Sequence, residues 1–437
     1  MKRNIEPHIQ FRQILYQNLA PSRDAAFEII DAIASSRDAR SAVEISLSPT
    51  MKRKFSSVYK GIERTRIDEE SLRPLLVKQA EVSGTLWFDG WALYALDHTP
   101  YPRHAAPTVF DRGYVQGADG RVIGHQYSLL GRVMHEQGSW IGIVDAQRIA
   151  SYQSPTVVGA AQIAALIAQA TWPCIISADS EYPVAVILAL AGKKLRLLIR
   201  LRGNNKLFGE PEPRPPGKRG APKKHGEQIK LNREETLGEP TRRLRVEETD
   251  GGWVLISVWE RMHFKSCPNL PLCVVRVESF KADGQRRFQR PLWLLWTGPA
   301  EMDWASFWRV YLKRFCLECV HQFTKNSLAW TRGRFGYTGR EERWTWLVML
   351  AYWQLLLAAP IARDLRRPWE KPTPEGRLPT PARVQRDYLR IFGEIGSPTS
   401  SPKVRGIPPG RPRGYRPAPR PRFNIVYKGR GGPVMNL

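Results

Sequence analysis

A change in the spacing of apolar residues near residue 84 constrains the fold of this chain more than any other feature. Three segments rich in β-formers are separated by turn sequences such as GADG and HEQG. After them the pattern alternates between helical spacing and short apolar strands. The predicted strands are 85–97, 120–134, 139–145, 174–179 and 195–202, and the predicted helices are 155–170 and 182–192. Antiparallel strands followed by alternating helices and strands predict a mixed α/β sheet flanked by helices.

The region before this sheet has a different pattern. Residues 1–82 place apolar residues at i, i+3 and i+4 and carry no strand signal, which predicts a small helical module. A basic stretch between its helices presents Lys52, Arg53, Lys54 and Lys60. These cations either grip a phosphate backbone or form a solvated surface, and the residues alone leave both interpretations open.

The region after the sheet begins with a loop. Pro, Gly and Lys dominate residues 203–230, and strand patterns return from about 240 to 298. We therefore expect a β-rich insertion, followed by helices at 343–358 and 381–395.

A basic tail ends the chain. From Gly396 onward it holds nine Lys or Arg, nine Pro and no Asp or Glu, so we expect it to be disordered. Within it, PGRPRG at 409–414 resembles an AT-hook, whose extended Arg-Pro-Arg lies in a narrow minor groove. Non-specific phosphate contact by Arg411 and Arg413 is the favoured interpretation of so short a match.

The overall charge indicates the class of partner. The 437 residues hold 67 Lys and Arg against 41 Asp and Glu, for a formal charge of +26. A polyanion such as nucleic acid is the first candidate, and a ribosome-like or membrane-surface role is the alternative. The N-terminus lacks the apolar core of a signal peptide. The longest apolar runs are each under 18 residues and contain Gln, which predicts buried helices in a soluble protein rather than membrane spans.

The cysteines give little support for a zinc site. Five cysteines are few and odd in number, as expected in a reducing cytoplasm. Cys316 and Cys319 form a CxxC with His321 nearby, but no second ligand pair follows at finger-like spacing. We favour the interpretation that these cysteines are buried as small apolar residues.

One segment combines cations, aromatics and a carboxylate. No Gly or Pro occurs between Pro299 and Gly333, which predicts one long helix. At about 100° per residue, four of its polar side chains fall within about 60° of the helix surface. They are Tyr311, Arg314, Glu318 and Lys325. The simplest interpretation is an exposed Arg–Glu pair at i,i+4, and a catalytic role requires partners from elsewhere in the chain.

Two aspartates supply such partners. Asp97 closes one predicted strand and Asp179 closes another, and the ends of neighbouring strands are a usual place for a site. Asp89 ranks below Asp97 because Asp-Gly favours a turn, and Glu181 is a fallback ligand. Two Asp and one Glu are enough to hold divalent metal ions for phosphodiester cleavage.

The order Asp97, Asp179, Glu318 resembles the DDE-type transposases of bacterial insertion sequences, which have a ribonuclease H-like core. The closest likeness is to the group with a β-strand insertion between the second Asp and the Glu. Its helix signature Tyr-x2-Arg-x3-Glu-x6-Lys is matched at all four positions named above, and LDHT and SADSEYP resemble its aspartate motifs. The likeness spans about residues 84–360. His98 and Pro183 depart from the pattern of the group without removing a metal ligand.

The resemblance implies five units. They are a helical DNA-binding module (1–82), the first part of the catalytic core (83–203), a basic loop with a β-rich insertion (204–298), the second part of the core (299–360), and a C-terminal helix with its tail (361–437). It also implies cut-and-paste transposition: cleavage at the element's terminal repeats and strand transfer into target DNA.

The resemblance assigns roles to individual residues. Asp97, Asp179 and Glu318 would hold Mg²⁺, for which Mn²⁺ would substitute. The side chains expected to contact double-stranded DNA are Tyr311, Arg314, Lys325, Lys218, Arg219, Lys223, Lys224, Arg411 and Arg413. Four insertion tryptophans are candidates for stacking a flipped base, although core packing is the favoured use of Trp253, Trp259, Trp293 and Trp296.

Further expectations follow from the same resemblance. We expect a homodimer when two ends are held together, and a cytoplasmic protein that joins the nucleoid when bound to DNA. A ribonuclease H-like nuclease and an inactive or domesticated transposase-derived DNA-binding protein are the alternatives.

Overall fold

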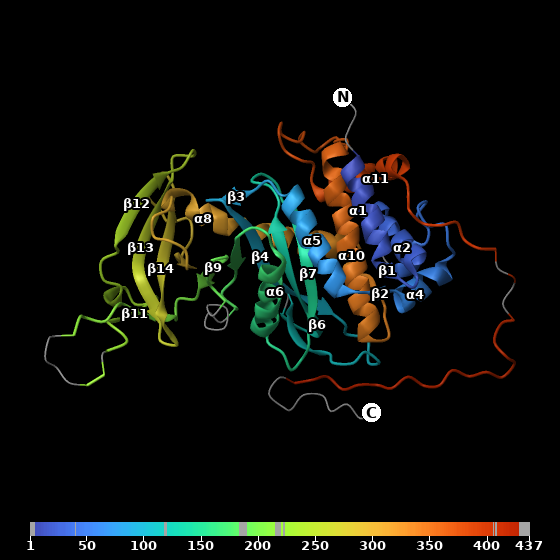
Figure 1. Cartoon of the computed structure of the whole chain (residues 1–437), viewed down its shortest axis with the longest axis horizontal. Helices are drawn as coiled ribbons and strands as arrows, with labels where there is room; N and C mark the ends of the chain where they lie inside the picture. Colours follow the sequence, from blue (N-terminus) through green and yellow to red (C-terminus); the bar gives the residue numbers. More distant parts are fainter. Residues whose placement is uncertain are drawn as a thin grey trace.

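The computed structural model describes residues 5–39, 41–117, 120–182, 190–214, 220–221, 223–404, 406 and 409–427. One large mixed sheet flanked by helices dominates it, which confirms the predicted mixed α/β class (Figure 1). Its strands are β3 (Trp87–Phe88), β4 (Trp91–Pro102), β5 (Gly113–Gly117), β6 (Gly120–Val133), β7 (Ile141–Ile149), β8 (Cys174–Ala178), β9 (Leu195–Leu201), β10 (Lys206–Phe208), β11 (Gln228–Lys230), β12 (Arg242–Glu247), β13 (Trp253–Phe264), β14 (Cys267–Phe280) and β15 (Leu292–Trp296).

Five of these strands form the centre of the sheet. Their spatial order is β7-β6-β4-β8-β9; β6 is antiparallel to both β7 and β4, whereas β4, β8 and β9 are parallel to one another. Helix α6 (Pro155–Gln169) makes the crossover from β7 to β8, as predicted, and its N-cap Ser154 accepts a hydrogen bond from the Val157 N–H. The predicted helix at 182–192 falls largely outside the described residues.

A tight hairpin begins the sheet. Asp89 and Gly90, between β3 and β4, have φ of 50° and 75°, the left-handed pair that a two-residue hairpin with right-handed twist requires. The prediction that Asp89 is a turn residue is confirmed.

The β-rich insertion continues the same sheet. β15 pairs antiparallel with β9 from Trp293↔Leu201 to Trp296↔Leu198, so the insertion strands extend the sheet beyond its central strands. β12, β13 and β14 form the far wing in Figure 1. Helix α8 (Trp304–Leu312) returns the chain from β15 and packs against β12.

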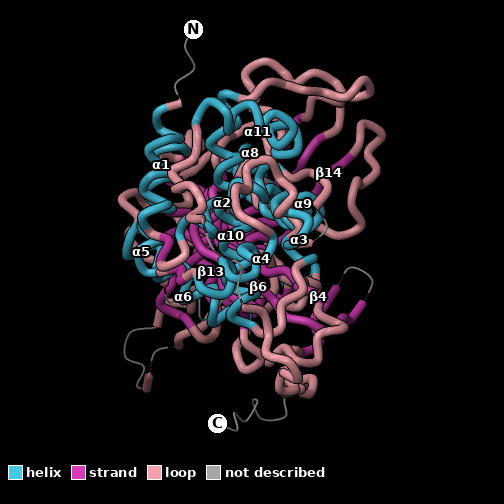
Figure 2. The backbone as a smooth tube through the Cα atoms, turned by 90° about the vertical axis from the view of Figure 1, so that its right-hand side faces the viewer, coloured by secondary structure: helices cyan, strands magenta, loops and turns pink. Residues whose placement is uncertain are grey.

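Helices from both ends of the chain pack together beside β7. The N-terminal helices are α1 (Glu6–Gln17), α2 (Arg23–Ser35), α3 (Ala42–Ile45), α4 (Phe55–Arg64) and α5 (Glu69–Ser83). They surround α10 (Thr338–Ala358) and α11 (Pro381–Ile395), as Figure 2 shows from the side. The expectation of no strand in this region is wrong, because β1 (Leu19–Ala20) and β2 (Arg66–Ile67) pair antiparallel. Two-residue strands are set by tertiary contact and leave no periodic signal.

Helix α10 is the core of this bundle. With the 3₁₀ turn η3 (Ala359–Ile361) it is long and apolar enough to cross a membrane, but 89% of its most apolar window is buried inside the protein. Trp344, Trp346 and Trp353 are among its fully buried side chains. The prediction of a buried helix is confirmed.

The tail departs from expectation. The described residues after Gly396 form no helix, turn at Arg413–Gly414, and end beside β5, where Gly113 and Val426 form an isolated parallel bridge. A tail disordered throughout is therefore not confirmed.

Candidate active site

The two predicted aspartates lie side by side at one end of the parallel strand pair. β4 and β8 pair in register up to Leu96↔Ala178, and Asp97 and Asp179 are the next residue on each strand. Asp179 follows β8, as predicted. The prediction that Asp97 closes its strand is wrong, because β4 runs on to Pro102 while Asp97 pairs with Leu129 of β6. The antiparallel partner extends β4 past the point where the parallel partner stops.

The predicted single helix over 299–333 is also wrong. The chain forms α8 and then α9 (Phe315–Ser327), with Lys313 and Arg314 as a step between them. In this step the Arg314 N–H bonds the Tyr311 carbonyl at 3.0 Å and the Leu317 N–H bonds the Arg314 carbonyl at 2.9 Å, an i→i−3 pattern that tightens the backbone. Lys313 also donates to the carbonyl of Glu136. The four signature residues are therefore split between two helices.

The step places the Arg314 guanidinium among all three predicted carboxylates. Its Nη2 lies 2.9 Å from Glu318 Oε1 and 3.9 Å from Asp179 Oδ2, and its Nη1 lies 3.3 Å from Asp97 Oδ2. The Arg314 side chain is 10% exposed, whereas those of Asp179 and Glu318 are 29% and 39% exposed. One buried cation thus brings together carboxylates from β4, the end of β8 and α9.

Burial and charge compete at this cluster. Burial is the largest effect on the pKa of Arg314 and lowers it, but Tyr311 and the three carboxylates outweigh it and raise the pKa above its ordinary value. Burial likewise raises the pKa of Asp97, but the hydrogen bond from His98 and the charges of His321 and Arg314 bring it below the usual value. Asp97 is therefore held as a carboxylate, the form in which it pairs with a cation.

Lys325 reaches the same region from the far end of α9. Its Nζ donates to Thr99 Oγ1 of β4 at 2.5 Å and lies 5.9 Å from the centre of the Trp330 ring. Burial lowers the pKa of Lys325 to about 8, with Asp97 acting in the opposite direction. Contact with an anion would stabilise the charged form of this partly desolvated ammonium group.

Sequence reasoning gave two histidines no role in the site. His98, noted only as a departure from the pattern, bonds Glu181 through Nε2 at 3.0 Å and flanks Asp97. His321 lies one turn after Glu318 on α9, and its Nε2 is buried without a hydrogen-bond partner. Burial lowers the pKa of His321 to about 4, so this imidazole is neutral near pH 7. The i, i+3 spacing places His321 on the same helix face as Glu318, and this spacing could have identified it from the sequence.

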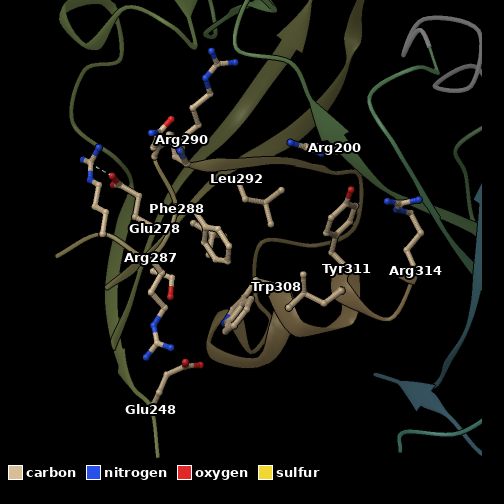
Figure 3. A pocket seen from close by; sticks show the side chains of 16 residues that line it. Arg200, Glu248, Glu278, Arg287, Phe288, Arg290, Leu292, Trp308, Tyr311 and Arg314 are labelled. Atoms are coloured by element: carbon tan, nitrogen blue, oxygen red, sulfur yellow. Dashed lines mark ion pairs between the residues drawn. The ribbon is translucent and has the colours of Figure 1, made fainter. Parts of the chain in front are cut away.

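A pocket of about 720 Å³ opens beside the cluster (Figure 3). It lies between β14, β15 and α8, and Tyr311 and Arg314 form the wall that it shares with the carboxylates. The other cations lining it are Arg200, Arg286, Arg287 and Arg290, and the other aromatics are Phe288 and Trp308. Arg200 Nη1 lies 3.8 Å from Asp179 Oδ1, which links the pocket to the cluster. None of these cations was singled out from the sequence, because strand and loop arginines carry no spacing signal.

The remaining residues predicted to contact DNA lie away from the carboxylate cluster or outside the described residues. Lys218 and Arg219 are outside the described residues. Lys223 and Lys224 are exposed in the insertion, where they line a smaller pocket with Glu210 and Arg261.

Two expectations about packing are confirmed. Trp259, Trp293 and Trp296 are buried in the core, while Trp253 is partly buried and stacks on Phe280 with ring centres 5.3 Å apart. Cys316 is buried, Cys319 is partly buried, and both are free thiols.

The donor set of the cluster suits a hard divalent cation. Asp97, Asp179 and Glu318 offer only carboxylate oxygens, the ligands that Mg²⁺ prefers. Within the described ranges, no three His, Cys, Asp or Glu side chains are arranged to hold a metal ion directly. The reason lies in the geometry: the guanidinium of Arg314 stands at the point toward which the carboxylates converge. An ion could be held there only if Arg314 moved aside, and a divalent ion would bring two positive charges in place of one.

Comparison with known proteins adds no assignment, since no protein-family model and no curated protein sequence matches this chain.

Proposed function

We propose that this protein is a DNA transposase that cuts at the ends of a mobile element and joins them to target DNA in a metal-dependent reaction. The observation that carries the proposal is the convergence of Asp97, Asp179 and Glu318 on a single cation. These residues are separated by 82 and 139 positions in the sequence. The resemblance of the sequence motifs to those of the transposase group implies the same three residues.

The arrangement of the sheet supports the same proposal. Three antiparallel strands are followed by two strands parallel to the first, as expected for a ribonuclease H-like core. Asp97 lies on β4, the first of these strands, and Asp179 directly follows β8, the fourth. Glu318 lies on α9, which follows the insertion in the sequence. This placement puts them at one end of the sheet, where strand ends can face a substrate.

In this proposal Asp97, Asp179 and Glu318 would hold the divalent ions. Bound ions would supply an activated water and would stabilise the leaving oxygen. Arg314, displaced from the carboxylates, turns to a phosphate of the DNA, and Lys325 exchanges its contact with Thr99 for a second phosphate. His321 stays neutral and buried against the cluster. The 3′-OH freed by cleavage is then held by the same carboxylate site for attack on target DNA, without a covalent protein–DNA intermediate.

The surroundings of the cluster suit a nucleic acid. The formal charge of +26 attracts a polyanion, and five arginines, three aromatics and two glutamates line the neighbouring pocket. Guanidinium groups bind phosphates and stack on bases, and aromatic rings stack on bases. This pocket would hold the strand that leads away from the cut.

The test is cleavage of a supercoiled plasmid that carries the sequences flanking the coding region, with Mg²⁺ or with EDTA. Glu318→Gln keeps the size of the side chain and removes a metal ligand, so we expect binding to survive and cuts at the element ends to disappear. Glu301→Gln, an exposed position before α8, is the matched control and should cleave like wild type. Cleavage that persists in Glu318→Gln would overturn the assignment.

A strand-transfer assay distinguishes a transposase from a nuclease and from an inactive DNA-binding protein. A nuclease with the same core would cut but would not join the ends to a second plasmid, whereas an inactive DNA-binding protein would bind without cutting in any metal. Joined products that carry the element ends are expected only from a transposase.

A further inference from the structure

The loop between α9 and α10 is held in place by buried side chains. Trp330 is fully buried, and its Nε1 donates to Thr345 Oγ1 of α10 at 2.9 Å. Phe335 is also buried. Arg103, just after β4, donates to the Gly333 carbonyl and, at 2.9 Å, to the Phe335 carbonyl. The backbone of this segment is therefore fixed by the core, and we call residues 330–337 the arginine loop.

Two cations of the arginine loop point away from the core. Arg332 and Arg334 are exposed, and neither pairs with a carboxylate among the described residues. The sequence Trp-Thr-Arg-Gly-Arg-Phe thus places one buried aromatic on each side of two exposed guanidinium groups. Cations on a backbone that is already ordered lose less entropy when they bind an anion than cations on a flexible segment.

The basic surface continues from the arginine loop onto α4. Helices α4 and α10 lie side by side (Figure 2). Arg343 Nε donates to the Ile62 carbonyl at 2.5 Å, and Arg340 pairs with Glu63 at 2.6 Å. The exposed cations on α4 and β2 that have no carboxylate partner among the described residues are Lys60, Arg64 and Arg66.

The acidic residues of α4 and of the first turns of α10 are already paired. Glu63 has the ion pair given above. Glu341 is buried and pairs with Arg103 at 2.9 Å, and Glu342 pairs with Arg148 at 2.7 Å. The exposed cations of the arginine loop and of α4 are therefore not compensated by these carboxylates, which favours binding of a polyanion.

The arginine loop lies close to the carboxylate cluster. The Tyr101 hydroxyl, on β4, donates to the Trp330 carbonyl at 2.9 Å, and Lys325 Nζ lies 5.9 Å from the centre of the Trp330 ring. Asp97 precedes Tyr101 by four residues on the same strand, a distance of roughly 13 Å at about 3.3 Å per residue. Because duplex DNA rises about 3.4 Å per base pair, a duplex that leaves the cluster along β4 reaches the loop after about four base pairs.

The surface suits a duplex better than a single strand. Single strands are held largely by free aromatic rings on which their bases stack. The exposed ring of the arginine loop is Tyr337, and it already carries Arg340 at 4.6 Å and Arg343 at 5.9 Å. Exposed guanidinium groups instead match the phosphates on the outside of a duplex.

We propose that the arginine loop binds the phosphates of duplex DNA between the carboxylate cluster and α4, with Arg332 and Arg334 as the contacting residues. The inference rests on the proposed function for the position of the cut, whereas contact with duplex DNA requires no cleavage. Phosphate contacts carry no sequence information, so the loop strengthens binding to every duplex alike and leaves the choice of sequence to other residues.

The experiment measures binding of a labelled duplex that carries the sequences flanking the coding region, by fluorescence anisotropy over a salt series in EDTA. Arg332→Gln with Arg334→Gln should lower the slope of log affinity against log salt by about 1.8, which is about 0.9 for each lost phosphate contact. Affinity for an unrelated duplex should fall by the same factor.

Two further variants separate a local contact from a general effect of charge. Arg366→Gln with Arg367→Gln removes the same charge from two exposed arginines that have no carboxylate partner among the described residues. They follow the other end of α10, whose 21 residues span about 31 Å, so this control should keep the wild-type slope. Arg332→Lys with Arg334→Lys retains the charge and should restore most of the slope.

Three results would overturn the proposal: an unchanged slope in the Arg332→Gln, Arg334→Gln variant, an equal fall in the control, or no recovery with lysine. A loop that binds a membrane surface would instead lose affinity for phosphatidylserine vesicles in the glutamine variant while keeping the duplex slope. Metal-dependent cleavage with an unchanged slope would refute the role of the loop alone, whereas the expected fall without cleavage in any metal would refute the proposed transposase alone.

Discussion

Replacing Arg314 by Gln removes the cation that holds the carboxylate cluster together. Breaking a fully buried ion pair costs about 3–5 kcal/mol, because the remaining charge stays desolvated. The three carboxylates here are not equally buried: Asp97 is 16% exposed, but Asp179 is 29% and Glu318 39% exposed, and water screens the last two. Most of the loss therefore comes from Asp97, and we expect metal-free Arg314→Gln to be destabilised by about 2 kcal/mol.

Divalent ions should reverse this loss. In the variant an ion can enter the cluster without displacing a guanidinium, so it should stabilise the variant more than wild type. An ion at a hundred times its Kd for the variant stabilises the variant by about 2.7 kcal/mol. The assay is chemical denaturation in EDTA and in Mg²⁺ or Mn²⁺. Arg309→Gln on α8 breaks only a half-exposed pair with Glu248 at 3.4 Å, and should change stability little in either condition.

The result that would refute this reasoning is specific. If Arg314→Gln were as stable as wild type in EDTA, or if divalent ions stabilised both equally, Arg314 would not stand in the place of a metal ion.

Further predictions concern packing and protonation. His8 is buried against Gln354, and burial lowers its pKa to about 3. The free energy of unfolding should therefore fall as the pH drops from 6.5 toward 3. In denaturation experiments, His8→Gln should flatten this part of the stability curve. Gly124→Ala would put a Cβ 2.2 Å from the Tyr101 carbonyl oxygen and should cost about 3 kcal/mol, whereas Gly393→Ala, in open space on α11, should stabilise by about 0.5–1 kcal/mol in the same measurement. Burial raises the pKa of Cys174 and Cys273 to about 12 and of Cys316 to about 11, so alkylation of the native protein at pH 8, followed by mass spectrometry, should spare these three; rapid labelling of Cys316 would contradict its burial.

Pattern in the sequence was enough to predict the elements with strong periodicity and the residues of the cluster. The alternation from residue 84 predicted β4, β6, β7, α6, β8 and β9 in their order, and the end of a predicted strand pointed correctly to Asp179, whereas β4 continues past Asp97. These features are local, so a single sequence carries them.

The remaining features depend on contacts between distant segments. The step at Lys313 and Arg314 contains neither Gly nor Pro, and is accompanied by contacts of Lys313 with Glu136 and of Arg314 with the carboxylates. Arg200 belongs to the site only because β9 pairs with β8 beside Asp179. The bridge between Val426 and Gly113 of β5 could not be predicted either, because the two residues lie more than 300 positions apart in the chain.

The central claim is that Asp97, Asp179 and Glu318 form one divalent-cation site, and calorimetric titration with Mn²⁺ tests it most directly. We predict that wild type binds Mn²⁺, that Asp97→Asn, Asp179→Asn and Glu318→Gln each weaken binding at least about tenfold, and that Asp89→Asn, in the exposed hairpin turn, binds like wild type. Equal Mn²⁺ affinity in wild type and all three cluster variants would contradict the account.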